Sequence, residues 1–168
     1  DNGSIDGSPD FVKNNYPQID LLDLGSNTGF AKGNNLGIQK ALEDKKCGYI
    51  ALLNTDARVS TNWLEVLLNF AKSKSNIASL QSPTLDYYNH GILDSRGLKV
   101  DFYGRAVQLG YREKFDKSML SHRIYGVNAA AAIYTRQFLE NQPFKSEYLD
   151  EEMWMFIEDV DIATRALM

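Results

Sequence analysis

The sequence predicts an α/β fold, with a mostly parallel sheet flanked by helices and a smaller mixed α+β half. A strand-like segment is followed by a helix-like segment twice, first over 19–42 and then over 49–71. Such alternation is typical of parallel sheets covered by helices, in which ligands bind beyond the carboxyl ends of the strands. After residue 77 the pattern changes to short strands separated by glycines, which predicts the α+β half.

The first part of the chain predicts a loop, a short helix and one strand–helix unit. Residues 1–8 are turn formers that suit a loop leaving a strand, and a short helix is expected between Pro9 and Pro17. Residues 19–24 form a brief apolar run that predicts a strand. A polar, glycine-bearing loop over 27–35 then leads into apolar residues at helical spacing.

The second unit has a stronger strand signal. Residues 49–53 form a continuous apolar run, which predicts a strand buried on both faces. Ser60 or Thr61 is expected to cap the next helix, which has a broad apolar stripe over 63–71.

Three later segments complete the expected fold. A hairpin is predicted across 98–109, and the C-terminal residues 157–167 are expected to be helical. The alanine-rich run 129–134 is ambiguous between strand and helix, because alanine disfavours strands but the run is short.

Bulk properties limit the classes of function. A chain of 168 residues suits a single domain with a substantial core. The net charge of −4 argues against nucleic acid or an anionic membrane as the main partner, since both require a dense basic surface. The longest uncharged stretch, 124–135, is too short to span a bilayer. Cys47 is the single cysteine, which excludes an internal disulfide and favours a reducing, cytoplasmic location.

Two groups of acidic residues are candidates for chemistry. Asp56 follows the 49–53 strand together with Asn54, and oxygen ligands of this kind suit Mg²⁺ or Mn²⁺. The alternative for Asp56 is a turn former or helix cap. Glu158 and Asp159 stand at a predicted helix start after an aromatic patch, which suits a general base beside an apolar wall. The alternative is stabilisation of the helix N-terminus by negative charge.

The loop over 27–35 is a third candidate. Backbone amides at a helix start, with Lys32 beside them, could meet a diphosphate, although the loop lacks the glycine pattern of a P-loop or dinucleotide fingerprint. A catalytic triad and a zinc site are disfavoured, since His90 and His122 are the only histidines and there is one cysteine.

Four sequence blocks together strongly resemble family 2 glycosyltransferases, in particular the rhamnosyltransferase-like enzymes of bacterial polysaccharide assembly. The blocks are DNGSIDGS at 1–8, NTGFAKGNNLGI at 27–38, ALLNTDARV at 51–59 and FIEDVDIATRA at 156–166. They occur in the order and approximate spacing of that family. The resemblance implies one GT-A domain over residues 1–168.

The resemblance also implies roles for individual residues. Asp1 would contact the nucleobase or ribose, and Asn27, Lys32 and Asn35 would lie near the nucleotide. Asp56 would hold a divalent metal, Mg²⁺ or Mn²⁺, as part of the DxD motif of the family, whose first acidic position is Asn54 in this chain.

The same resemblance implies the reaction and its partners. Asp159 of the ED motif would remove the proton of the acceptor hydroxyl, and Glu158 would orient the acceptor or loop. The donor would be a nucleotide-diphospho-sugar, the acceptor a saccharide or lipid-linked saccharide, and the reaction would invert the anomeric carbon.

Family members also have segments that this sequence lacks. They begin with a strand and helix before the DNGS loop and continue beyond residue 168. We therefore expect a domain truncated at both ends, with any peripheral contact with the inner membrane face made by other regions.

Two alternatives to an active transferase remain at this point. One is an inactive nucleotide-sugar-binding or scaffold module of the same fold. The other is a sugar-nucleotide pyrophosphorylase, which would release diphosphate and has a glycine-rich N-terminal signature that is missing from this sequence.

Overall fold

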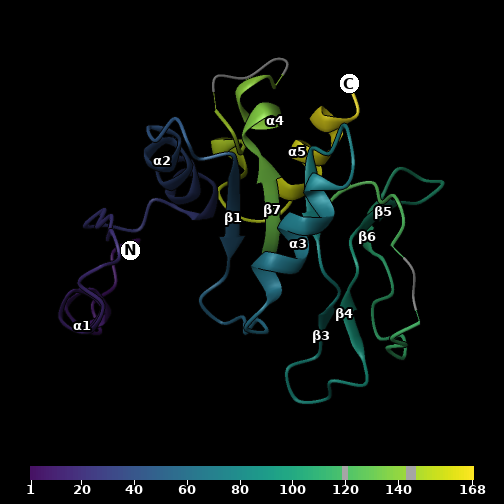
Figure 1. Ribbon diagram of the computed structural model, residues 1–168, viewed down its shortest axis with the longest axis horizontal. Helices are drawn as coiled ribbons and strands as arrows, with labels where there is room; N and C mark the ends of the chain where they lie inside the picture. Colours follow the sequence, from purple (N-terminus) through teal and green to yellow (C-terminus); the bar gives the residue numbers. More distant parts are fainter. Residues whose placement is uncertain (119–120, 143–146) are drawn as a thin grey trace.

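The computed structural model describes residues 1–118, 121–142 and 147–168 (Figure 1). The helices and strands, in chain order, are α1 (Ser8–Asn15), α2 (Phe30–Leu42), β1 (Tyr49–Leu53), α3 (Trp63–Lys72), β2 (Ser79–Gln81), β3 (Thr84–Leu85), β4 (Leu93–Ser95), β5 (Leu98–Val100), β6 (Ala106–Gln108), β7 (Ala131–Thr135), α4 (Arg136–Glu140), the 3₁₀ helix η1 (Glu151–Met153) and α5 (Glu158–Ala166).

The main sheet is antiparallel, so the prediction of a mostly parallel sheet is wrong. Its strand order is β1-β7-β2, and β7 is antiparallel to both neighbours. Strands β1 and β2 consequently run in the same direction, as the strand–helix–strand pattern β1-α3-β2 predicts. The sheet differs from the expectation because β7, which follows much later in the chain, lies between them.

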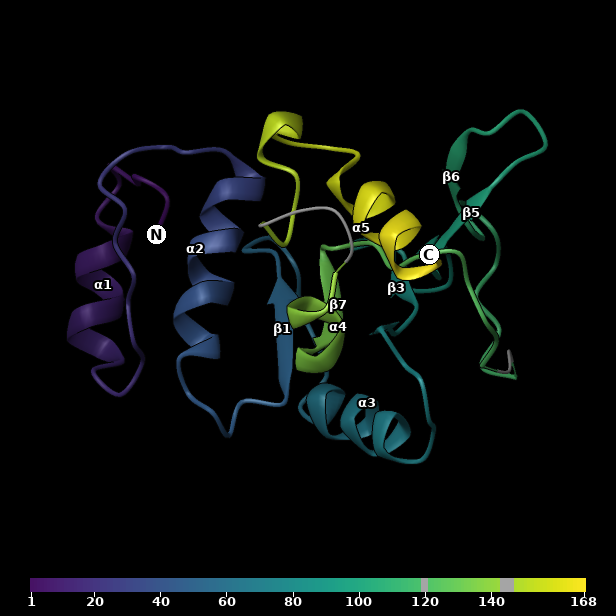
Figure 2. The ribbon, with the colours of Figure 1, turned by 90° about the horizontal axis from the view of Figure 1, so that it is seen from above.

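Strand β1 is buried on one face rather than on both, contrary to prediction. Ile50 and Leu52 are buried, whereas Ala51 and Leu53 are exposed. The buried face lies against α2, while α3, on the other side of the sheet, packs against β2 (Figure 2). A continuous apolar run therefore did not require two covered faces here.

Residues 19–24 do not form the predicted strand. Asp1 bonds this segment on both sides: its terminal amino group donates to the Leu22 carbonyl at 2.6 Å, and its carbonyl accepts from the Leu24 N–H at 3.0 Å. This is the slanted bonding pattern of neighbouring parallel strands. It involves one residue and does not make a ladder.

The core lies between the sheet and the helices α2 and α5. Alternate residues of β1 and β7 face these helices, because successive side chains of a strand point to opposite faces. The cluster of buried residues comprises Ala31, Ile38, Leu42, Ile50, Leu52, Val127, Ala129, Ala132, Tyr134, Leu139, Leu149 and Ile162. Figure 2 shows α5 on one face of the sheet and α3 on the other.

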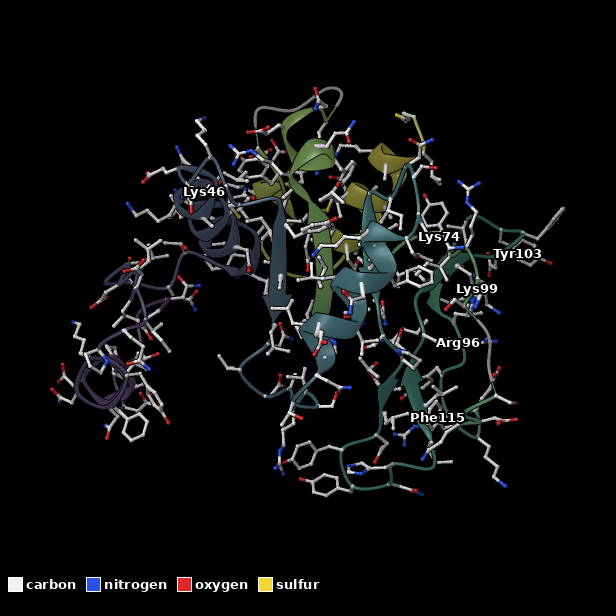
Figure 3. All side chains as sticks on the ribbon, viewed as in Figure 1. Lys46, Lys74, Arg96, Lys99, Tyr103 and Phe115 are labelled. Carbon is white, nitrogen blue, oxygen red and sulfur yellow. The ribbon has the colours of Figure 1, made fainter. Side chains whose placement is uncertain are left out.

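The second half contains small antiparallel pairs, as predicted. Strands β5 and β6 form the expected hairpin, with Leu98 opposite Gln108, and β3 pairs with β4. Figure 3 shows Lys99 and Tyr103 on this hairpin, at the opposite end of the molecule from α1. The ambiguous run at 129–134 becomes strand β7, and the predicted helices near the two ends form α1 and α5.

Within the described ranges, none of the helices has the length and apolar character needed to span a bilayer.

Candidate functional site

The two predicted carboxylate motifs meet at one edge of the main sheet. The N–H of Asn54, just beyond the end of β1, donates to the Ala130 carbonyl at 2.8 Å, just before β7 begins. In the same segment, the backbone N–H of Ala129 lies near enough to the Asp159 carboxylate to lower its pKa. Asp56 lies two residues beyond Asn54 in a turn and is exposed. The segment just before β7 therefore lies beside both motifs: Ala130 bonds Asn54, and Ala129 lies near Asp159.

The N-terminal loop and the start of α2 join the same edge through Asn2 and Trp154. Asn2 accepts from the Thr28 N–H at 2.8 Å and donates to the Gly29 carbonyl at 3.0 Å. The N–H groups of Phe30 and Ala31 donate to the Trp154 carbonyl at 2.9 and 3.2 Å. The first two sequence blocks are thus joined directly, and the second is joined to the segment that precedes the ED motif. Asn2 was not among the predicted site residues, although it lies in the first of the four blocks.

Gly29 shows why the loop before α2 requires a glycine. Its φ of +84° is in the left-handed region, where a side chain is strained. A Cβ on Gly29 would also lie 2.8 Å from the Trp154 ring, closer than carbon atoms approach. The indole of Trp154 therefore packs directly on the backbone of the predicted nucleotide loop.

The same contacts argue against an anion site made by the backbone at the start of α2. The N–H of Thr28 is bonded to Asn2, that of Gly29 to the Asn27 side chain, and the next two to Trp154. These amides already have acceptors, so they are not available to a diphosphate in this conformation. Lys32, whose side chain is exposed on α2, is the part of the prediction that this finding leaves open.

Asn35 makes structural contacts, and its predicted place beside the nucleotide stays a prediction. Its side chain is only 6% exposed. The amide nitrogen donates to the Leu149 carbonyl and the amide oxygen accepts from the Leu149 N–H, both at 2.8 Å. A further bond joins it to Glu151 at 3.1 Å. Both ends of the amide therefore hold the segment that precedes the ED motif.

Asp1 and Asn27 also make local contacts. The Asp1 carboxylate accepts from the N–H groups of Gly3 and Ser4 at 2.9 and 2.8 Å. The Asn27 side chain accepts from Gly29 and from the Asn2 amide. These bonds shape the loops on which both residues lie, and their predicted contacts with a nucleotide stay predictions.

The ED motif begins α5 after a strained turn. Trp154, Phe156 and Ile157 all have positive φ, at 52°, 72° and 70°. Such values are uncommon for bulky side chains and often occur at functional sites. The turn leaves Trp154, Met155, Phe156 and Ile157 largely exposed beside Asp159.

The two carboxylates of the motif are in an apolar environment. Glu158 is 6% exposed, and its Oε2 atom has no hydrogen-bond partner among the described residues. Burial raises the pKa of Glu158, and the charge of Asp159 adds to this effect. Burial also raises the pKa of Asp159, while backbone N–H groups, including that of Ala129, act in the opposite direction. Asp159 remains partly open to the surface.

Asp161, the third acid of the block, anchors the helix. It pairs with Arg165 at 2.7 Å one turn along α5. Arg165 is buried and donates to the Tyr148 carbonyl at 2.6 Å and to Gln142. These contacts fix the helix that carries Glu158 and Asp159.

A test of the buried carboxylate is the stability of Glu158→Gln. The folded-state pKa of Glu158 is raised, so its stabilising contribution is complete below the unfolded pKa of about 4.3 and is lost as pH rises through the folded value. The neutral amide should therefore increase the free energy of unfolding at pH 7 by about 1–2 kcal/mol. The increase should disappear near pH 4. Urea unfolding at both pH values measures this.

Glu152→Gln is the matched control, because Glu152 is exposed on the neighbouring η1 helix. Its stability should be unchanged at both pH values. A Glu158→Gln protein that is less stable than wild type at pH 7 would show that the charged form is favourably bound.

Comparisons with known proteins identify the family and the fold. The profile of glycosyl transferase family 2 matches residues 1–141. The crystal structure of A197 from STIV is similar, with a TM-score of 0.54 and 16% identity over 99% of this chain and 74% of that chain. At this identity the likeness concerns the fold. A comparison with curated protein sequences gives no significant match. The chain therefore belongs to glycosyl transferase family 2 and has a GT-A-like fold.

Proposed function

We propose that this chain is the catalytic part of an inverting glycosyltransferase that transfers a sugar from a nucleotide-diphospho-sugar to a saccharide or lipid-linked saccharide. The main support is the position of Asp159, a partly buried carboxylate with a raised pKa at the sheet edge that Asp56 also adjoins. The family match carries no preference for rhamnose. The donor sugar is therefore named only by its class.

Asp159 is the proposed base. As the acceptor oxygen forms its bond to the anomeric carbon, its proton moves to the Asp159 carboxylate. The bond from the anomeric carbon to the diphosphate oxygen breaks, and its electron pair leaves with the nucleoside diphosphate. One displacement of this kind inverts the anomeric carbon. A base whose pKa is raised toward the working pH is better suited to this transfer than an exposed aspartate.

Glu158 and the anchored helix support that base. Glu158 is buried beside it and does not reach the surface, so its role is to hold the start of α5 and to orient the acceptor-side turn. The ion pair of Asp161 with Arg165 holds the next turn of the same helix. The proton acceptor is therefore fixed before the acceptor sugar arrives, which is the condition for efficient proton transfer.

A divalent metal, Mg²⁺ or Mn²⁺, fits the site only if the protein and the diphosphate of the substrate coordinate it together. The described residues contain no group of three or more histidine, cysteine or acidic side chains that could hold an ion by themselves. Asp56 offers one exposed carboxylate, with Asn54 two residues before it. Mg²⁺ is commonly held by one or two carboxylates together with substrate phosphates and water. Bound there, the metal would neutralise charge on the departing diphosphate.

The experiment is a panel of nucleotide sugars with saccharide acceptors, assayed with and without a chelator. We expect release of a nucleoside diphosphate that depends on divalent metal. Nucleoside-diphosphate binding, measured by calorimetry, should weaken on chelation and in Asp56→Ala, because the carboxylate and diphosphate oxygens together bind the cation. Asp20→Ala, at an exposed aspartate, is the control.

Each other outcome points to a different function. Release of diphosphate would indicate a pyrophosphorylase, and binding without turnover would indicate a binding or scaffold module. Equal affinity with and without chelator, or an unaffected Asp56→Ala variant, would rule out the proposed metal role.

A further inference from the structure

The turn at the tip of the β5–β6 hairpin carries two aromatic side chains that are largely exposed. Phe102 is 97% exposed and Tyr103 is 80% exposed. Their rings contact each other edge to face, with centroids 5.7 Å apart. Figure 1 shows the hairpin projecting from the body of the molecule, and Figure 3 shows Tyr103 near its far end. Exposed apolar groups that lie together in this way commonly mark a site of interaction.

The turn is held in one shape although its side chains are exposed. The Asp101 carboxylate accepts from the N–H groups of Tyr103 and Arg105, both at 2.9 Å. It also forms an ion pair with the Arg105 side chain at 2.8 Å. The Gly104 N–H donates to the Asp101 carbonyl at 3.0 Å. The two rings are therefore presented on an ordered turn, which lowers the entropy cost of binding.

Basic side chains accompany this aromatic tip. Lys99 and Arg105 are exposed on either side of it. A third exposed base, Arg123, directly precedes the segment that hydrogen-bonds to Leu98 of β5 from the edge opposite β6. The hairpin carries one acid, Asp101, which already pairs with Arg105. Cations therefore predominate at this end of the chain, although the net charge of the whole is −4.

The shape of the tip fits a fluid surface better than a rigid partner. A projecting turn offers no concave wall, and small ligands usually bind in clefts. A stable protein interface requires roughly 800 Å² on each partner, far more than a short turn supplies. A bilayer requires neither, because its headgroups rearrange around inserted rings. Aromatic side chains favour the level of the headgroups, and lysine and arginine reach the lipid phosphates.

We propose that the tip of the β5–β6 hairpin docks on a phospholipid bilayer, with Phe102 and Tyr103 inserted at the level of the headgroups and Lys99 and Arg123 beside the lipid phosphates. The net charge of −4 disfavours binding through charge alone, but the two rings supply most of this contact. The inference goes beyond the proposed function and does not depend on it, although an enzyme that glycosylates a lipid-linked acceptor would gain from such docking.

The experiment is flotation of the full chain with vesicles of phosphatidylcholine and phosphatidylglycerol. Phe102→Ser combined with Tyr103→Ser should weaken vesicle binding by at least about tenfold, because burial of even one aromatic side chain favours binding by that factor or more. Both side chains are exposed, so the fold should be unchanged, and circular dichroism checks this.

A second turn of the same kind provides the matched control. Tyr87 and Tyr88 are also neighbouring exposed rings, with centroids 5.3 Å apart, in a turn that Asp86 caps through backbone N–H groups. Residues 85–92 include no lysine or arginine. Tyr87→Ser combined with Tyr88→Ser should leave vesicle binding unchanged. The comparison separates docking through the hairpin from general adsorption of exposed aromatic residues.

Charge provides an independent test. Lys99→Glu should weaken binding to the mixed vesicles by roughly 5–30-fold, because one base near an anionic surface contributes about a factor of five and its reversal acts twice. The effect should be small on vesicles of phosphatidylcholine alone. Lys46→Glu is the control for net charge, since Lys46 is exposed on the opposite side of the molecule (Figure 3).

Fluorescence measures the insertion of the tip directly. Phe102→Trp should show more quenching by brominated lipids than wild type, whereas Tyr88→Trp should show no added quenching. A wild-type chain that does not bind vesicles would overturn the inference, whatever is found for sugar transfer. Undiminished binding of the tip variant, or equal losses from the two pairs of substitutions, would overturn it as well. Selective loss at the tip with added quenching supports it even if no transfer is found.

Discussion

Asp159→Asn is expected to reduce sugar transfer by about 10²–10⁴-fold, the usual contribution of a positioned base. The amide keeps the shape of the side chain but cannot take the proton of the acceptor hydroxyl. Binding of the nucleotide sugar should be nearly unchanged, because Asp56 and the loops around Asn2 are untouched. Turnover and binding must be measured separately, the first by product release and the second by calorimetry.

Asp116→Asn is the control for this change, since Asp116 is an exposed acid in the α+β half of the chain. A loss of both binding and turnover in Asp159→Asn would indicate that the carboxylate stabilises the start of α5 instead. A turnover rate near that of wild type would show that Asp159 is not the base.

Asn35→Leu is expected to lower the free energy of unfolding by about 2–4 kcal/mol, because it leaves the N–H and the carbonyl of Leu149 buried without partners. For a domain of this size the melting temperature should fall by roughly 5–15 °C. Thermal unfolding followed by circular dichroism measures the change.

Asn34→Leu is the matched control at the neighbouring position. The Asn34 amide bonds the Phe30 carbonyl within the same helix at 2.9 Å, and the residue is only partly buried. Its replacement should change stability by about 0.5 kcal/mol or less. Equal losses in the two variants would show that the bonds of Asn35 to Leu149 are not the source of the effect.

The local elements could be predicted from the sequence because their signals are local. The spacing of apolar residues gave α2, and Pro9 gave the start of α1. The strand β1 and the hairpin of β5 and β6 follow from short apolar runs and glycines. The sheet order could not be predicted in the same way, because the place of β7 depends on pairing between distant segments.

The candidate site shows the same division. The positions of Asp56 after a strand and of Asp159 at a helix start could be predicted from their neighbours in the chain. The contacts of Asn35 with Leu149 join residues 114 positions apart, and no local pattern in the sequence predicts such a contact.

The position of β7 also constrains how the chain folds during synthesis. Strands β1 and β2 hydrogen-bond to β7 and not to each other. The backbone groups that pair with β7 therefore have no strand partner until residues 131–135 have left the ribosome. Pairing between such distant segments slows folding, and open strand edges favour aggregation. The candidate site at this end of the sheet is therefore completed late, after both Ala129 and Asp159 have been synthesised.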